Sequence, residues 1–220
     1  MLFNKDKILS SSLYRAGIVF SSRLLNTLLT FLFTLLAGKL LSVEDHGFYG
    51  QSLARMILIQ TITEAGLQFS IVRFLTKALH NKEDPSALIH ASLLIKVIAA
   101  FVAFVIITIS IGLSPFFSVI SPEQYPDSVT FLWMVFLGGT GMSFISYLDG
   151  ILVSHERYGK LSLWIPSVGF LRLFLLLMFV IGGKHALRYD HVIYSYVLAP
   201  YLAGALFFLF FPASFFIKKS

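Results

Sequence analysis

The chain contains 220 residues, of which 57% are hydrophobic and only 13% are charged. Its mean hydropathy of +0.83 lies far outside the range of soluble globular proteins and indicates an integral membrane protein. The sequence has no cysteine, which excludes disulfides, thiolate catalysis and cysteine-ligated metal sites within it. The formal net charge of +6 requires no nucleic acid partner, because basic residues flank membrane helices on their cytoplasmic side.

Continuous apolar stretches predict six transmembrane helices. The hydrocarbon core of a bilayer is about 30 Å thick, so a helix needs about 20 apolar residues to cross it. The stretches of this length are residues 17–38, 48–69, 89–113, 129–153, 161–182 and 192–211. We therefore predict an all-α, polytopic membrane protein in which residues 1–220 form a single transmembrane domain.

The distribution of Lys and Arg predicts the topology. One set of loops and termini contains most of the basic residues, namely Lys5, Lys7, Arg15, Arg73, Lys77, Lys82, Arg157, Lys160, Lys218 and Lys219. The opposite loops contain only Lys39, Lys184 and Arg188. Under the positive-inside rule, both termini are expected on the cytoplasmic side and the first loop outside.

A polar stripe runs along the first predicted helix. At about 100° per residue, its side chains fall within about 60° of Arg23: Arg23, Asn26, Thr27, Thr30 and Thr34. Ser, Thr and Asn often hydrogen-bond between transmembrane helices, so one interpretation is a helix–helix contact. A charge at the bilayer centre costs at least about 2.5 kcal/mol, so Arg23 favours the other interpretation, the wall of a hydrated cavity.

The second predicted helix has two polar faces. Arg55 lies nearer its external end, whereas Glu64 lies nearer the cytoplasm on a different side, and Gly66 follows as a point where the helix can bend. Arg23 and Glu64 lie at a similar depth on antiparallel neighbours, because each residue adds about 1.5 Å along a helix. We therefore expect these two side chains to come within salt-bridge distance in at least one conformation.

Three further charged residues lie within the predicted helices. Arg172 is near the middle of its helix, where the side chain cannot easily reach the head groups, so we expect it to face a lumen. Lys96 is near enough to the inner face for its ammonium group to extend to the interface. Asp149 is close enough to the same face to be an interfacial residue.

The remaining motifs indicate little chemistry. Gly138, Gly139 and Gly141 lie inside an apolar helix with no preceding strand and no following GK[ST] sequence, so close helix packing is a better interpretation than a phosphate loop. The six histidines show no paired metal-ligand spacing. We therefore expect no metal site and no cofactor.

Two short motifs resemble those of a known family. Residues 35–78 contain a helix end, a turn, and a second helix with a central glycine and a terminal arginine. The matching residues are Leu41, Ser42, Glu44, Gly47, Tyr49, Gly66 and Arg73, and a later turn contains Glu156, Arg157, Tyr158 and Gly159. Together with the six alternating helices, these motifs are similar to those of Wzx-type polysaccharide flippases in the MATE-like multidrug/oligosaccharidyl-lipid/polysaccharide exporter superfamily.

The resemblance implies a transporter of the bacterial inner membrane and not an enzyme. Family members usually have two pseudo-symmetric lobes of six helices, so the chain resembles an N-terminal lobe that works with a second lobe or with a copy of itself. The implied cargo is an undecaprenyl-pyrophosphate-linked oligosaccharide, such as an O-antigen, capsule or other exopolysaccharide repeat unit. Alternating access would move it from the inner to the outer leaflet.

The resemblance also implies roles for the polar residues. Guanidinium groups bind phosphate oxygens bidentately, and the arginines implied to bind the pyrophosphate are Arg23, Arg55 and Arg172. The residues implied to hydrogen-bond sugar hydroxyl groups are Asn26, Thr27, Thr30 and Thr34. Glu64 would hold an arginine when no cargo is bound, or carry a coupling proton.

Two other functions are compatible with the sequence. A MATE-like exporter of small molecules would place buried carboxylates opposite cationic cargo, yet basic residues outnumber acidic ones within these helices. A non-transporting membrane scaffold would bury the polar stripe in dry helix contacts. The surroundings of Arg23 and the threonines therefore distinguish a transporter from a scaffold.

Overall fold

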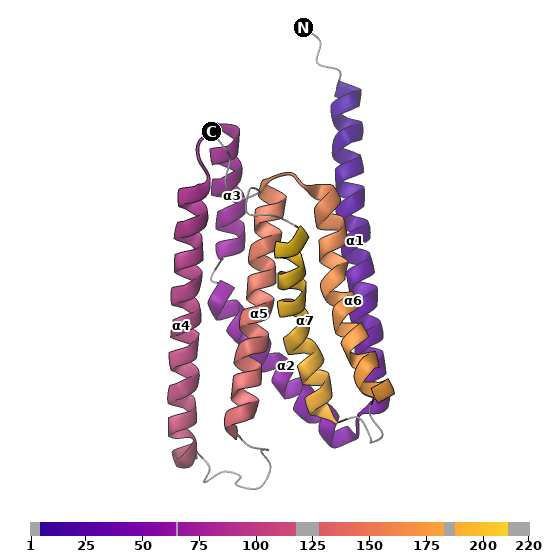
Figure 1. Ribbon diagram of the computed structural model, residues 1–220, viewed down its shortest axis with the longest axis vertical. Coiled ribbons are helices and arrows are strands. Elements are labelled where there is room, and N and C mark those ends of the chain that lie inside the picture. Colours follow the sequence, from indigo (N-terminus) through magenta and orange to yellow (C-terminus); the bar gives the residue numbers. More distant parts are fainter. Residues whose placement is uncertain (1–4, 65, 118–127, 183–187, 211–220) are drawn as a thin grey trace.

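The computed structural model describes residues 5–64, 66–117, 128–182 and 188–210, and this part of the chain forms helices and no strand (Figure 1). The helices are α1 (Lys5–Leu40), α2 (Val43–Glu64), α3 (Leu67–His80), α4 (Ser86–Phe117), α5 (Ser128–Ser154), α6 (Tyr158–Gly182) and α7 (Tyr189–Phe210). The prediction of an all-α, polytopic membrane fold is confirmed. Five of the helices, α1, α4, α5, α6 and α7, are long and apolar enough to cross a membrane.

The second expected span, residues 48–69, is divided between two helices. α2 ends at Glu64 and α3 begins at Leu67, and between them Gly66 has a φ of +73°. Glycine populates this left-handed region without the steric penalty that other residues meet. Figure 1 shows α2 running diagonally across the bundle and α3 continuing towards the end where α1 begins. The two helices together therefore make the traverse that the sequence predicts as one.

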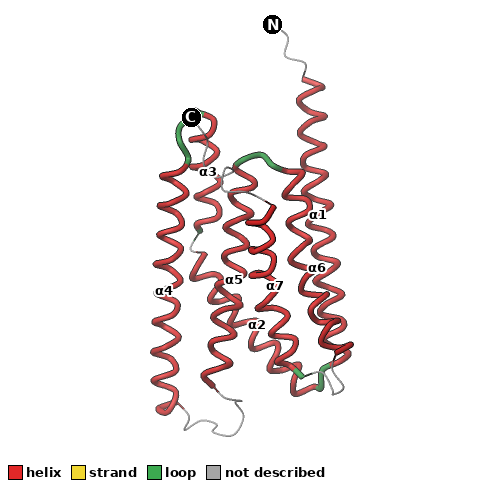
Figure 2. The backbone as a smooth tube through the Cα atoms, in the orientation of Figure 1, coloured by secondary structure: helices red, strands yellow, loops and turns green. Residues whose placement is uncertain are grey.

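The helices pack with their connections at two ends of the bundle (Figure 2). α1 packs mainly on α6, whereas α5 is central and contacts α2, α3, α4, α6 and α7. α1 begins and α7 ends towards the same end, as the even number of predicted crossings requires (Figure 1). We refer to this end as the inner end, because the positive-inside rule predicts that it is cytoplasmic.

Short polar caps stabilise the starts of α2 and α4. The hydroxyl oxygen of Ser42 accepts a hydrogen bond from the backbone N–H of Asp45 at 3.1 Å, and its O–H donates to the Asp45 carboxylate at 2.9 Å. At the start of α4, Asp84 accepts hydrogen bonds from the backbone N–H and the hydroxyl of Ser86. These bonds hold the pKa of the Asp84 carboxyl below its usual range. Both caps satisfy groups that a helix start leaves free.

Close glycine contacts fix α5 against its neighbours. A methyl group on Gly139 would lie 2.7 Å from the backbone oxygen of Met56, and one on Gly138 would lie 2.6 Å from the Met56 sulfur. On another side of α5, a methyl group on Gly141 would lie 3.1 Å from Pro200. The interpretation of this glycine cluster as a helix-packing element is confirmed.

Two hydrophobic clusters fill the two halves of the bundle. The cluster in the outer half, near the α1–α2 turn, includes Phe33, Tyr49, Met56, Val135 and Tyr196. The cluster in the inner half includes Leu75, Leu148, Leu152, Trp164 and Phe207. Apolar side chains also remain exposed along α4, including Leu94, Val97, Ile98 and Phe101. This exposed apolar surface suits contact with lipid.

Candidate functional site

The polar stripe of α1 lies beside the surface that packs against α6. Arg23, Thr27 and Thr34 are exposed, and Asn26 and Thr30 are half-buried. Each threonine hydroxyl donates to the backbone oxygen four residues earlier, at 2.9 to 3.0 Å. The hydroxyl groups are therefore satisfied within α1 and need no second helix.

Two residues of the stripe also contact other helices. A methyl group on Gly169 of α6 would lie 2.6 Å from the side-chain oxygen of Asn26, so α1 and α6 approach closely at this point. The side chain of Thr34 lies close to that of Tyr49, so α1 also meets α2 at this point. The stripe therefore combines helix contacts at these positions with an exposed surface at Arg23 and Thr27.

Charged side chains from several helices gather around Asp149 of α5. The charges of Arg23 on α1 and Glu64 on α2 both act on its carboxylate, which also accepts a hydrogen bond from the indole N–H of Trp164 at 2.5 Å. Arg23 and Glu64 do not form an ion pair in this conformation, as neither has an acidic or basic partner within 4.0 Å in the described part of the chain. The expected pairing of these two residues in some conformation stays a prediction.

Lys96 on α4 is buried, contrary to the expectation that it extends to the interface. Its side chain is only 7% exposed, and its ammonium group donates to the hydroxyl oxygen of Ser143 on α5 at 2.7 Å. The ammonium nitrogen also lies 5.5 Å from the ring centroid of Tyr147. The expectation was wrong because depth along the helix says nothing about the partner that α5 provides. The charge of Glu64 also acts on Lys96.

Arg172 on α6 is enclosed by aromatic rings from three other helices. Its guanidinium carbon lies 3.5 Å from the ring centroid of Tyr196 and 6.0 Å from that of Phe33, and the charge also interacts with Tyr49. The side chain is 7% exposed, and its Nε–H has no hydrogen-bond partner within the described residues. Arg172 thus lies beside Phe33, about 15 Å along α1 from Arg23. The structure does not bring these two arginines together.

The two candidates on α2 lie far apart along that helix. Arg55 is half-buried in its middle, next to Met56. Glu64 is the last residue of the helix and is half-buried directly before the break at Gly66. Glu64 and Arg23 are therefore each within electrostatic reach of Asp149, and Arg55 lies in a separate position along α2.

A family model provides the functional assignment. The model described as "Polysaccharide biosynthesis protein" matches residues 13–220, nearly the whole chain. The chain belongs to this family. No curated protein and no solved structure matches the chain. The family gives the protein a role in polysaccharide synthesis or export, and it bears out the resemblance to Wzx-type flippases. With its membrane-spanning helices, this polysaccharide biosynthesis protein is a multi-pass membrane protein in contact with the lipid bilayer.

The motif residues of this polysaccharide biosynthesis protein have structural contacts. Arg15 near the start of α1 forms an ion pair with Glu156 at 2.9 Å, and its guanidinium lies 5.7 Å from the ring centroid of Tyr158. Glu156 lies in the turn between α5 and α6, and Tyr158 is the first residue of α6. Ser42 caps α2, as described above. The later motif therefore contacts α1, and the earlier one caps the following helix.

Two hollows in the structure are not lined by any of the eight predicted site residues, although Ser22 and Leu25, which line the second, are sequence neighbours of Arg23 and Asn26. One, of about 310 Å³, lies between α3 and α4, and the other, of about 480 Å³, is lined by α1 residues and Ser162 of α6. Neither is lined by Arg23, Arg55 or Arg172. Within the described residues, no group of three or more His, Asp or Glu side chains is arranged to hold a metal ion.

Sequence reasoning missed the polar contacts on α5. Ser143 and Asp149 lie on different sides of this helix and contact Lys96 and Trp164 respectively. Asp149 was detectable as an acid within an apolar helix, whereas Ser143 carries no signal because serine is common in membrane helices. The partners of both depend on tertiary packing.

Proposed function

We propose that this polysaccharide biosynthesis protein moves an undecaprenyl-pyrophosphate-linked oligosaccharide from the inner to the outer leaflet by alternating access. The observation that carries the proposal is the exposed surface of α1 that presents Arg23 and Thr27, in a chain of this family. A cation on a membrane helix costs at least about 2.5 kcal/mol in hydrocarbon. A hydrated cavity or a covering protein surface therefore suits this side of α1 better than lipid does.

The chemistry of the stripe suits a lipid-linked sugar. A pyrophosphate carries negative charge through the membrane, and the Arg23 guanidinium offers paired donors that offset the loss of hydration. The threonine hydroxyl oxygens and Asn26 offer hydrogen bonds to sugar hydroxyl groups. Glu64 and Asp149 lie within electrostatic reach of one another, and this pair of acids is suited to holding Arg23 when cargo is absent.

Arg55 and Arg172 have roles that depend on conformation in this proposal. Arg55 lies on α2 and contacts the cargo after the cargo has moved beyond Arg23. Arg172 is enclosed in the outer half of the bundle in this conformation, so it reaches cargo only when its aromatic neighbours separate. The exposed side of α1 faces a second lobe or a copy of the chain, which supplies the opposite wall of the cavity.

Export in living cells tests the role of the stripe. In the source bacterium with the gene deleted, the Arg23→Gln variant should lower surface polysaccharide about tenfold or more, since a charge-assisted hydrogen bond contributes about 1.5–3 kcal/mol. Arg188→Gln is the control, because Arg188 is an exposed basic residue outside the stripe and outside both motifs. Blotting of membranes establishes equal abundance of the two variants.

The alternative of a non-transporting scaffold has its own support. Asn26 packs against Gly169, and the threonine hydroxyls are satisfied within α1. Normal export by Arg23→Gln at normal abundance would favour the scaffold and contradict the flippase proposal. Accumulation of the lipid-linked oligosaccharide in the inner leaflet of this variant would support the flippase.

A further inference from the structure

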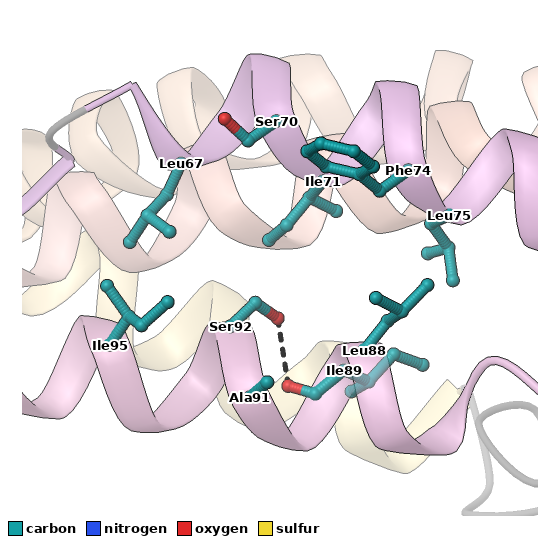
Figure 3. Close-up of a pocket in the computed structure, with 10 residues that line it drawn as sticks. All are labelled: Leu67, Ser70, Ile71, Phe74, Leu75, Leu88, Ile89, Ala91, Ser92 and Ile95. Atoms are coloured by element: carbon teal, nitrogen blue, oxygen red, sulfur yellow. Dashed lines mark hydrogen bonds between the residues drawn. The ribbon is translucent and has the colours of Figure 1, made fainter.

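An apolar hollow of about 310 Å³ lies between α3 and α4 (Figure 3), and α3 lies in the inner half of the bundle (Figure 1). Side chains of Leu67 and Phe74 on α3 and of Leu88 and Ile95 on α4 help to form its walls. From residue 67 to 75 it follows α3 for about 12 Å. Such a hollow within the depth of a bilayer is open to hydrocarbon chains.

The lining of the hollow favours a hydrocarbon occupant over water. Its only polar lining residues are Ser70 and Ser92. The Ser92 hydroxyl already donates to the backbone oxygen of Ile89 at 2.8 Å and lies 3.2 Å from the Tyr147 hydroxyl. An apolar cavity of about 150 Å³ stays dry and binds benzene, so one of about twice that volume takes a stretch of acyl chain rather than water.

Two exposed basic side chains lie at the edge of this face of α3. Lys77 follows Phe74 by one turn towards the inner end, whereas Arg73, one turn after Ser70, lies at the height of the hollow on the adjacent side of the helix. Both basic side chains are exposed, and neither has an acidic partner within 4.0 Å in the described part of the chain. Their charges are thus available to a phosphate at the membrane surface.

Basic residues outnumber acidic residues at the end of α3 and in the loop after it. Lys82 adds a third exposed basic residue to Arg73 and Lys77, whereas the acidic residues are Glu83 and Asp84. The Glu83 carboxylate accepts a hydrogen bond from Asn81 at 3.1 Å, and the Asp84 carboxylate accepts two from Ser86 at the start of α4. Both acids are therefore engaged by their own loop, beyond the helix face that carries Arg73.

We propose that this hollow binds one acyl chain of an anionic phospholipid of the inner leaflet, whose phosphate lies against Arg73 and Lys77. Basic pockets between membrane helices on the cytoplasmic side bind anionic head groups, and the adjacent hollow adds a place for the chain. The bound lipid fills the space between α3 and α4. This site does not depend on the flippase proposal.

Native mass spectrometry of the full chain in detergent tests the site with phosphatidylglycerol and phosphatidylcholine as probes. One phosphatidylglycerol should bind more tightly than phosphatidylcholine. The double variant Arg73→Gln, Lys77→Gln should weaken phosphatidylglycerol binding by about 25-fold, which is about fivefold for each basic residue near an anionic surface. Ala91→Phe, which fills the hollow from α4, should weaken the binding of both lipids.

Matched variants separate this site from general effects. Val97 is 59% exposed on the opposite face of α4, so Val97→Phe should leave binding unchanged, as should Arg157→Gln at the same end of the bundle. Equal binding of the two lipids, or an equal loss in Arg157→Gln, would overturn the proposal. Undecaprenyl phosphate that displaces phosphatidylglycerol tenfold more effectively than a second phospholipid would also overturn it, because the hollow would then belong to a polyprenyl chain. The double variant changes only exposed residues, so it remains informative if Ala91→Phe fails to fold.

Discussion

Arg172 shows how a membrane protein accommodates a cation without a carboxylate. Among the described residues, no acidic side chain lies within 4.0 Å of its guanidinium, which instead lies over the ring of Tyr196 and near that of Phe33. A desolvated cation–π contact contributes about 2 kcal/mol or more. Its aromatic neighbours lie on α1, α2 and α7, so Arg172 joins α6 to three other helices in the outer half of the bundle.

Replacing Tyr196 should separate the contribution of the ring from that of the hydroxyl. We expect Tyr196→Leu to lower the free energy of unfolding by at least about 2 kcal/mol, because the buried guanidinium loses its aromatic partner. Tyr196→Phe keeps the ring and loses only the hydroxyl group, so its effect should be smaller. Thermal unfolding of the purified protein in detergent measures both. Equal losses in the two variants would contradict a cation–π role.

At the scale of elements, the break between α2 and α3 depends on one backbone conformation. Gly66 has a positive φ, and a methyl group placed on it would meet no atom within 4 Å. Any penalty for a side chain there is therefore conformational and not a matter of space. The break lets α2 run diagonally while α3 stays along the wall formed by α4 and α5 (Figure 1).

A substitution at Gly66 should consequently destabilise the protein through strain alone. We expect Gly66→Ala to cost about 1–2 kcal/mol, the penalty for an ordinary residue in the left-handed region. Gly66→Asn should cost less, because asparagine visits this region more readily. Gly47→Ala is the matched control, since Gly47 lies within α2, has the same free space and should become slightly more stable as alanine. A Gly66→Ala variant as stable as the Gly47→Ala control would show that the positive φ is unnecessary.

The sequence predicted the positions of the helices better than the contacts that their polar side chains make. Apolar length located the membrane helices, and Gly66 was identified as a bend because glycine tolerates conformations that other residues avoid. The separate helix α3 was not predicted, since its apolar residues continue the preceding run. Lys96 was assigned to the interface from its depth, whereas the hydroxyl of Ser143 provides a buried partner. Such partners lie far away in sequence, so no local pattern identifies them.

At the scale of the whole molecule, the helices differ in how much of their surface is packed against other helices. The central helix α5 contacts five others, whereas α1 packs mainly on α6 and leaves Arg23 and Thr27 exposed. The rest of the exposed surface of α1 is apolar at residues such as Phe20 and Phe31, as is the exposed face of α4 at Val97. The polar stripe of α1 and the exposed face of α4 therefore differ as expected for a hydrated surface and a lipid-facing surface. The protein therefore offers a direct comparison between a proposed hydrated side and a lipid side within one bundle.

The absence of cysteine from the sequence makes this comparison measurable, because a single introduced thiol can be labelled without background. In native membranes, Thr27→Cys should react with a water-soluble maleimide, since only a thiol in contact with water forms the reactive thiolate readily. Val97→Cys on α4 should remain unlabelled, because hydrocarbon surrounds it. Both variants should label fully after denaturation in detergent, which shows that each thiol is intact. If Thr27→Cys is as unreactive as Val97→Cys while export stays normal, the α1 stripe lies in a dry contact and the hydrated cavity of the proposed flippase is not on this side of the bundle.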